Sequence, residues 1–280
     1  GSARREEPGE SVMYIATRRI RGFDPVRASD VESSKAVGKI YEGLVQYSYL
    51  HRPYRIEPLL AEAMPRVSED GLTYTFRIRK GIFYQDDPCF AATGGRGREL
   101  AAGDFIYAIK RVADVKNESG GYWAFESKIE GLDDFRRASA GAAATGYDTP
   151  VRGLQAPDPH TLVIRLTEPY PQIQWVLSMN YAFAVPREAV ERYGEDFSAH
   201  PVGTGPYILK SWRRNYMQEF VSNPKWAETG RVELYPRDGE PLDAAAGLLS
   251  DAGRQLPFLD RIVQYVMDDE STQWLTFVMG

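Results

Sequence analysis

The clearest structural signal lies in residues 68–81, which read Ser68-Glu69-Asp70-Gly71-Leu72-Thr73-Tyr74-Thr75-Phe76-Arg77-Ile78-Arg79-Lys80-Gly81. Asp70-Gly71 is a strong turn signal, and after it apolar and polar side chains alternate as far as residue 79. A period of two is typical of a strand with one face on a hydrophobic core. The stretch therefore predicts a turn followed by a half-buried strand.

Working outward from this strand, strands and helices mix without strict alternation, which predicts an α/β fold of mixed α+β type. A helix should start at Asp30 and be ended with the help of Gly43. Residues 12–16 predict a buried strand, and 138–149 predict a linker of small residues. Further strands are expected at 151–156, 161–166, 207–212, 218–221 and 262–267, further helices at 105–112, 173–177, 186–193 and 271–280, and a long polar insertion at 228–256.

Length and composition exclude several classes of protein. At 280 residues the chain is long enough for about two domains. Its net charge of −5 argues against nucleic-acid binding, and its single cysteine against a disulfide framework or a cysteine-rich zinc site. The acidic pairs Asp86-Asp87 and Asp133-Asp134 lack the ligand ladder of a calcium loop. We expect no metal and no cofactor.

No recognisable catalytic motif is present. The three histidines, His51, His160 and His200, lie far apart, and a chance histidine on a loop is a better interpretation than a catalytic base. Gly95-Arg96-Gly97-Arg98 is the nearest approach to a phosphate-binding fingerprint, but it lacks the third glycine and a preceding strand, so a surface loop is favoured. Cys89 reads as a partly buried structural thiol. The sequence does not indicate an enzyme.

Three groups of segments, taken in order, carry a resemblance to one family. They are Asp24-Pro25 with Ile40-Tyr41-Glu42-Gly43-Leu44-Val45, then Pro58-Leu59-Leu60-Ala61-Glu62 with 68–81 and 104–111, then Pro201-Val202-Gly203-Thr204-Gly205-Pro206-Tyr207 with Asn223-Pro224 and Leu259-Asp260-Arg261-Ile262-Val263. The chain resembles the family 5 extracytoplasmic solute-binding proteins, which are the peptide, oligopeptide and dipeptide receptors of ABC importers. Two features depart from the family pattern: Ala101 stands where a capping Thr is usual, and the insertion at 228–256 is long.

The resemblance implies a periplasmic-binding-protein-like fold of type II that is incomplete here. Lobe I would comprise residues 12–50 plus 160–268, and lobe II residues 51–159. Residues 1–11 would be a tag scar and disordered lead. Residues 269–280 would begin the connection to a lobe III that this chain lacks, because family members are considerably longer.

The resemblance also implies where a ligand would bind. Ser29, Asp30 and Val31 match the edge on which the family holds a peptide backbone like an added strand, although Asp30 could equally be a helix cap. Tyr122 is similar to a family tyrosine that lines the pocket, and Trp123 is an equal candidate because the preceding loop differs in length. Gly203-Thr204-Gly205 would border the cleft as a structural turn.

The implied function is capture of peptides by lobe closure and their delivery to the membrane permease, without a cofactor or nucleic acid. The protein would be periplasmic or extracytoplasmic, and in its native form either free or tethered to the membrane as a lipoprotein. The alternatives are a non-peptide solute (a metal chelate, haem, an opine or a sugar) and a sensor or regulatory domain. An unrecognised enzyme is a weaker alternative.

Overall fold

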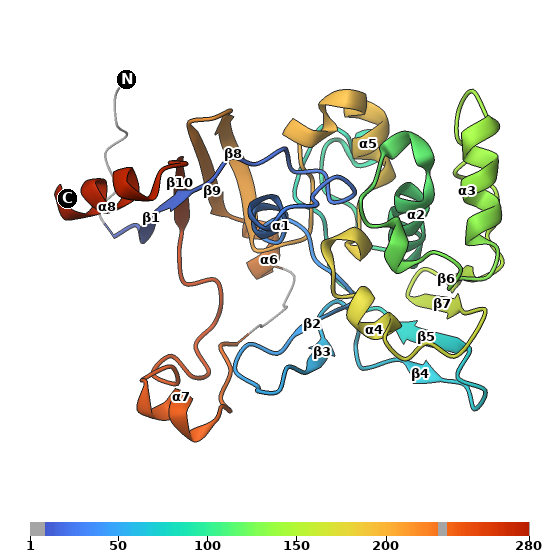
Figure 1. Cartoon of the computed structure of the whole chain (residues 1–280), viewed down its shortest axis with the longest axis horizontal. Coiled ribbons are helices and arrows are strands. Elements are labelled where there is room, and N and C mark those ends of the chain that lie inside the picture. The colour runs from blue at the N-terminus through green and yellow to red at the C-terminus, as the bar shows by residue number, and fades with distance from the viewer. Residues whose placement is uncertain (1–8, 229–233, 280) are drawn as a thin grey trace.

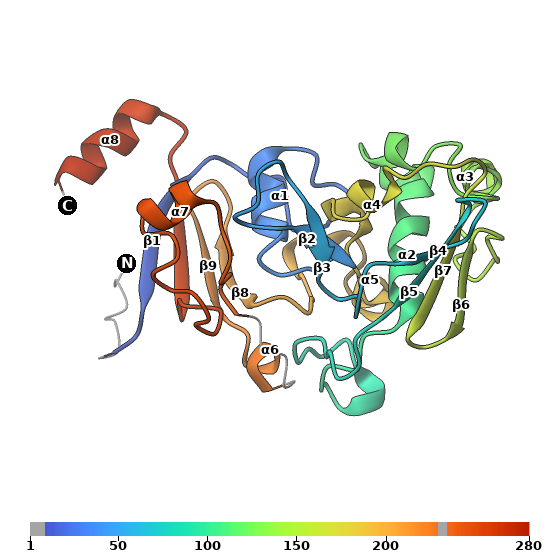
Figure 2. The ribbon, with the colours of Figure 1, turned by 90° about the horizontal axis from the view of Figure 1, so that it is seen from below.

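The computed structural model describes residues 9–228 and 234–279. In this part of the chain one four-stranded sheet lies at each end of an elongated molecule, and helix α1 and a small two-stranded sheet lie between them (Figure 1). Figure 2 shows the same arrangement from below. The buried residues form a core cluster that reaches from one sheet to the other. The predicted mixed α/β class is confirmed.

The first sheet joins the two ends of the chain. Its order is β1 (Val12–Thr17), β10 (Arg261–Val266), β9 (Met217–Ser222) and β8 (Tyr207–Arg213), with β1 and β10 parallel and the other pairs antiparallel. The prediction that residues 12–16 are a buried strand is half wrong. They form a strand, but Met13, Tyr14 and Ile15 are exposed because β1 is the edge strand of this sheet in the described residues.

The prediction of a disordered lead over residues 1–11 is wrong for residues 10 and 11. Residues 1–8 lie outside the described part of the chain, but the two residues before β1 are held. Glu10 forms a salt bridge with Arg261 at 3.0 Å, and the main-chain nitrogen of Ser11 donates to Asp260 Oδ2 at 2.9 Å. These contacts hold residues 10 and 11 against the start of β10.

Helix α1 (Val31–Val37) packs between the two ends of the molecule. Asp30 is its N-cap, as predicted, but the helix ends at Gly38 rather than near Gly43. The chain beyond Gly38 pairs with a distant segment instead: Ile40 O accepts from Gly205 N at 2.8 Å, and Lys39 O accepts from Tyr207 N at 3.1 Å. The apolar residues at helical spacing after residue 38 are buried, but not in a helix.

The second sheet contains the strand from which the sequence analysis began. Its order is β4 (Arg66–Val67), β5 (Thr73–Arg77), β7 (Thr161–Arg165) and β6 (Leu154–Asp158), all antiparallel. Tyr74 and Phe76 on β5 are buried opposite Ile164 and Leu162 on β7, which confirms the predicted alternation. Helix α2 (Ala102–Ala113) packs against β6 and β7, and α3 (Leu132–Gly141) packs against α2.

The remaining elements connect the two ends. The prediction of a linker at 138–149 is wrong at its start, because α3 continues to Gly141 and buries Ser139. A hairpin of β2 (Val45–Tyr47) and β3 (Ile56–Pro58) forms the small sheet. The other helices are α4 (Ile173–Val176), α5 (Arg187–Tyr193), α6 (Pro224–Glu228), α7 (Pro241–Ala245) and α8 (Glu270–Met279), with 3-10 turns at Ala91–Thr93, Val115–Asn117, Tyr122–Ala124, Asn180–Ala182 and Gly194–Ala199. No helix within 9–228 or 234–279 is long and apolar enough to cross a bilayer.

One predicted lobe boundary has to move. A boundary between residues 159 and 160 would separate β6 from β7, which are the two arms of one hairpin. β7 also pairs with β5 over its whole length, so residues 161–165 belong with the second sheet. The rest of the division, with the first sheet in lobe I and the second in lobe II, stays a prediction.

Candidate functional site

The segment before α1 is held in place by side chains from two distant loops. Asn180 Nδ2 donates to the main-chain oxygens of Pro25 and Ala28 at 3.0 and 2.9 Å. Ser119 Oγ donates to the main-chain oxygen of Val26 at 2.8 Å. These three bonds satisfy the carbonyl groups that face inward and fix the path of the chain up to Ala28.

The three residues that follow are accessible, and several of their main-chain groups form no hydrogen bond within the described residues. Ser29 and Val31 are exposed, and Val31 retains 67% of its accessible surface. Within the described residues, no partner is present for the N–H groups of Ser29 and Val31 or for the carbonyl of Ser29. Asp30 is used differently: its carboxylate accepts from Ser33 N at 2.8 Å and Ser33 Oγ at 2.7 Å. The side chain of Asp30 caps the helix while the neighbouring main chain stays open.

The second predicted region lies beside the first. A Cβ atom on Gly120 would lie 3.3 Å from Ser29 Cβ, so this loop passes directly against the exposed segment. Gly121 packs flat on the ring of Tyr181, where a Cβ would come within 2.3 Å of the ring. The glycines of this loop therefore allow its close approach to residue 29.

The structure separates the two aromatic candidates. Tyr122 is buried, donates its hydroxyl to Asp133, and has the guanidinium of Arg136 4.1 Å from its ring centroid. Burial and then the Asp133 carboxylate raise the pKa of Tyr122 above its usual value. Trp123 is 63% exposed. Tyr122 is committed to packing against α3, and Trp123 is the ring that a ligand could reach.

Gly203-Thr204-Gly205 is packed into the interior. A Cβ on Gly203 would lie 1.9 Å from Ile40 O, and one on Gly205 would lie 2.7 Å from the same residue. Thr204 is buried and donates its hydroxyl to Glu42 Oε2 at 2.9 Å. The turn holds the chain after α1 against β8.

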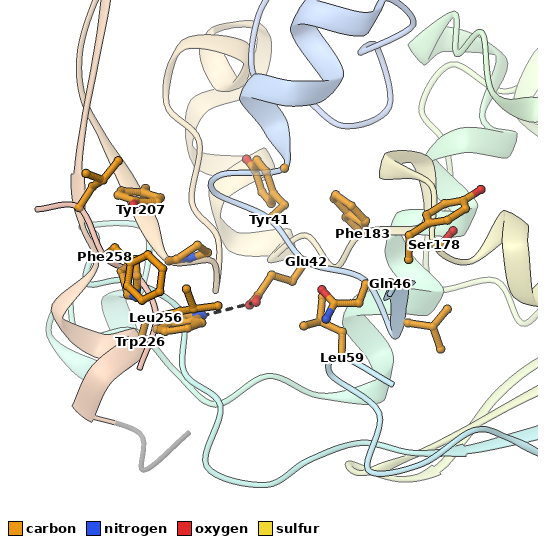
Figure 3. Close-up of a pocket in the computed structure, with 16 residues that line it drawn as sticks. Tyr41, Glu42, Gln46, Leu59, Ser178, Phe183, Tyr207, Trp226, Leu256 and Phe258 are labelled. Atoms are coloured by element: carbon orange, nitrogen blue, oxygen red, sulfur yellow. Dashed lines mark hydrogen bonds between the residues drawn. The ribbon is translucent and has the colours of Figure 1, made fainter. Parts of the chain in front are cut away.

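A hollow that the sequence did not reveal is lined in part by Pro206 and Tyr207, which directly follow this turn (Figure 3). Its volume is about 530 Å³, and its walls are mainly apolar and aromatic. Glu42 lies on the wall and accepts from Trp226 Nε1 at 3.4 Å as well as from Thr204. The labelled lining residues come from six separate stretches of the chain: Tyr41, Glu42 and Gln46; Leu59; Ser178 and Phe183; Tyr207; Trp226; and Leu256 and Phe258. No local sequence pattern could have joined these stretches.

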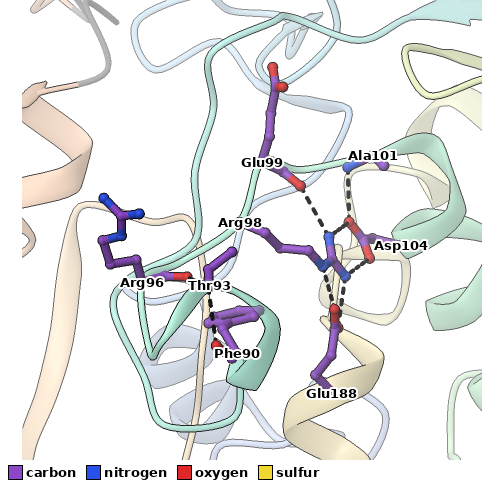
Figure 4. Close-up of polar contacts among 8 residues, drawn as sticks. All are labelled: Phe90, Thr93, Arg96, Arg98, Glu99, Ala101, Asp104 and Glu188. Carbon is purple, nitrogen blue, oxygen red and sulfur yellow. Dashed lines mark hydrogen bonds and ion pairs between the residues drawn. The ribbon is translucent and has the colours of Figure 1, made fainter.

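The arginine-bearing loop is structural (Figure 4). The Arg98 guanidinium contacts the Asp104 carboxylate at 2.7 and 2.9 Å and the Glu188 carboxylate at 2.5 and 2.9 Å. Asp104 also accepts from the main-chain nitrogen of Ala101 at 2.9 Å, so the helix start is held without a capping side chain at position 101. Arg98 is fully engaged by two carboxylates, which leaves the Gly95–Arg98 loop unsuited to a phosphate group.

Replacing Glu188 by glutamine should make the loss of stability depend on pH. Burial raises the pKa of Glu188, but the hydrogen bond from Arg98, a main-chain hydrogen bond and the positive charges of Arg98 and Arg187 together hold the pKa below the ordinary 4.5. The carboxylate therefore stabilises the fold fully above about pH 4.5, and this contribution disappears as the pH falls through the depressed pKa. Urea unfolding of both proteins should show a difference at neutral pH that shrinks in acid. A difference that stays constant would contradict this.

Each of the three histidines has a neighbour of its own. His51 Nδ1 is 2.7 Å from Ser48 Oγ, His200 stacks on Tyr193, and His160 lies 3.8 Å from Glu99. Cys89, which was predicted to be partly buried, is buried, and burial raises the pKa of its thiol. Across the described residues no group of three or more His, Cys, Asp or Glu side chains is placed to hold a metal ion.

A family model and curated relatives both match this chain, and both are of bacterial binding proteins. The model of the family described as bacterial extracellular solute-binding proteins, family 5 Middle, matches residues 55–280. The glutathione-binding protein GsiB of Escherichia coli O1:K1 is 29% identical over 218 residues, which cover 78% of this chain and 35% of that protein. The chain thus spans about a third of the length of such curated relatives.

Solved structures of longer chains share this fold. The peptide-binding pheromone receptor PrgZ has a TM-score of 0.71 at 23% identity, with 97% of this chain and 46% of that chain covered. Listeria monocytogenes OppA bound to peptide has a TM-score of 0.70 at 20% identity, with 97% and 45% covered. At these identities the likeness shows the fold alone.

Proposed function

Because the chain belongs to family 5 of the bacterial extracellular solute-binding proteins, we propose that it binds a short peptide along the main chain of residues 29–31. The fold is that of the type II periplasmic binding proteins, as predicted. The family and the matched structures are binding proteins rather than enzymes. In the whole protein, the peptide would be enclosed outside the cytoplasm by lobe closure and passed unchanged to the permease of an ABC importer.

The observation that supports this proposal best is the open main chain beside Asp30. The N–H of Ser29, the carbonyl of Ser29 and the N–H of Val31 have no partner in the described residues, although Asn180 holds the chain just before them rigidly. An extended peptide can complete such an edge as an added strand, which gives affinity with little dependence on its side chains. Because the edge is fixed in advance, little conformational entropy is lost on binding.

The names of the matched relatives support a peptide substrate. GsiB is named as glutathione-binding, and the structures include OppA bound to peptide and a murein tripeptide binding protein of Escherichia coli. The exposed Trp123 ring would give a peptide side chain an apolar surface. We propose short peptides of this size for the present chain.

Replacing Val31 by proline tests the main-chain contact with little risk to the fold. Val31 is the first residue of α1, where proline is well tolerated, and Asp30 has the extended conformation (φ −110°, ψ 160°) that a residue before proline requires. The change removes one N–H. It should weaken binding of acetylated triglycine by about threefold to tenfold, measured by NMR titration of residues 1–280.

The matched control is Val31→Ala, which removes the side chain but keeps the N–H. It should bind the peptide nearly as well as the unaltered chain. Equal affinities of the proline and alanine variants, with both folded by circular dichroism, would contradict binding through the main chain at this position.

A further inference from the structure

A cavity lies next to the proposed peptide edge and is more polar than the hollow of Figure 3. Its volume is about 450 Å³, and it is enclosed between the segment leading to α1 and the loop before Tyr122. Its lining includes Arg21, Arg27, Ser29, Asn117, Glu118 and Ser198. Ser29 lines the cavity and is also the first residue of the proposed peptide-binding edge. The cavity therefore extends from this edge toward residues 21–27.

Two of the acidic groups near the cavity, Asp24 and Asp30, already have partners. Asp24 is buried, and both of its oxygens accept from the Arg111 guanidinium, at 2.9 and 2.8 Å. Asp30 accepts two bonds from Ser33. Glu118 is the remaining carboxylate of the lining. The lining thus holds two guanidinium groups, Arg21 and Arg27, together with the carboxylates of Asp24 and Glu118, and Asp24 is already neutralised by Arg111.

Three donors in the cavity are uncommitted. Within the described residues, no hydrogen bond or ion pair engages the Arg27 guanidinium, the Ser29 hydroxyl or the Ser198 hydroxyl. Arg21, in contrast, lies 3.9 Å from Asp30. A guanidinium with two hydroxyl donors is a set that suits a carboxylate, because charge-assisted bonds to it are short and strong.

We propose that this cavity binds the C-terminal carboxylate of the peptide, with Arg27 as its ion-pair partner and Ser29 and Ser198 as further donors. The inference rests on the proposed function, since a strand added along residues 29–31 places one of its ends at the cavity. Arg27 then determines specificity: ligands with a free C-terminus are preferred over amidated ones.

NMR titration of residues 1–280 with acetylated triglycine and with its C-terminal amide tests this. The free acid should bind at least about tenfold more tightly than the amide and should shift the Arg27 Nε–Hε signal and the amides of Gly120 and Ser198. The amide should shift only the signals of residues 29–31. Equal affinities, or an Arg27 signal that does not respond to the acid, would overturn the carboxylate site.

Arg27→Gln should abolish the preference for the free acid, and Arg27→Lys should retain part of it. Arg66→Gln removes another exposed guanidinium, from β4, and should change nothing. If the acid and amide bind equally but Val31→Pro still weakens both, the carboxylate site is wrong and peptide binding stands. If neither ligand binds, both proposals are wrong.

Discussion

Replacing Arg111 by methionine is expected to lower the free energy of unfolding by about 3–5 kcal/mol. Arg111 on α2 and Asp24 in the loop before α1 form a bidentate pair, and their side chains are only 5% and 6% exposed. Burial lowers the pKa of Arg111, but the Asp24 carboxylate more than offsets this and raises the pKa above its usual value, so the guanidinium stays charged. The substitution would leave a buried carboxylate without its partner.

Urea unfolding followed by circular dichroism measures this effect. Arg137→Met is the control, because Arg137 pairs with Asp134 on the surface of α3 with both side chains largely exposed. That variant should lose less than about 0.5 kcal/mol. A double variant, Asp24→Leu with Arg111→Met, should recover much of the loss, because it removes both buried charges. Similar losses in the Arg111 and Arg137 variants would refute the importance of burial.

Replacing Gly203 by alanine is expected to lower the free energy of unfolding by about 3 kcal/mol or more. The added Cβ would lie 1.9 Å from the carbonyl oxygen of Ile40 and 2.7 Å from its carbon. Hydrogen bonds hold both sides of this contact. The carbonyl oxygen of Ile40 accepts from Gly205 N, and the carbonyl oxygen of Gly203 accepts from Gln85 N at 3.0 Å. The strain would reach the chain on both sides of the turn.

Gly103→Ala is the matched control for this variant. Gly103 lies in the first turn of α2, and its Cβ would meet no atom within 4 Å. Alanine is a better helix former than glycine, so this variant should be unchanged or more stable by up to about 1 kcal/mol. Thermal unfolding of the two variants side by side compares them. A Gly203→Ala protein as stable as Gly103→Ala would show that the packing is looser than described.

The strands were predictable from the sequence because their signal is local. Alternation from Leu72 to Ile78 is visible in a single stretch, and the structure pairs β5 over that stretch. The end of α1 was not predictable in the same way. Apolar residues continue at helical spacing beyond Gly38, but the main-chain groups of Lys39 and Ile40 bond to residues 205 and 207. Tertiary pairing with a distant segment overrode the local pattern.

The site was only partly predictable for the same reason. The cap by Asp30 follows from residue type and position, and the structure confirms it. The resemblance brought Tyr122 and Trp123 forward as equals, because only the fold determines which ring is buried. Asn180, which holds the exposed segment, lies far away in the sequence and gave no signal. Contacts between distant loops have no periodicity that a sequence can show.

Hydrogen exchange at the amides of Ser29 and Val31, with and without acetylated triglycine, tests the main-chain binding edge most directly. Bound peptide should slow the exchange of both amides, because each N–H would gain a hydrogen bond that it lacks in the free chain. Unchanged exchange at both amides, at a peptide concentration that saturates the chain by an independent binding assay, would show that the peptide binds elsewhere.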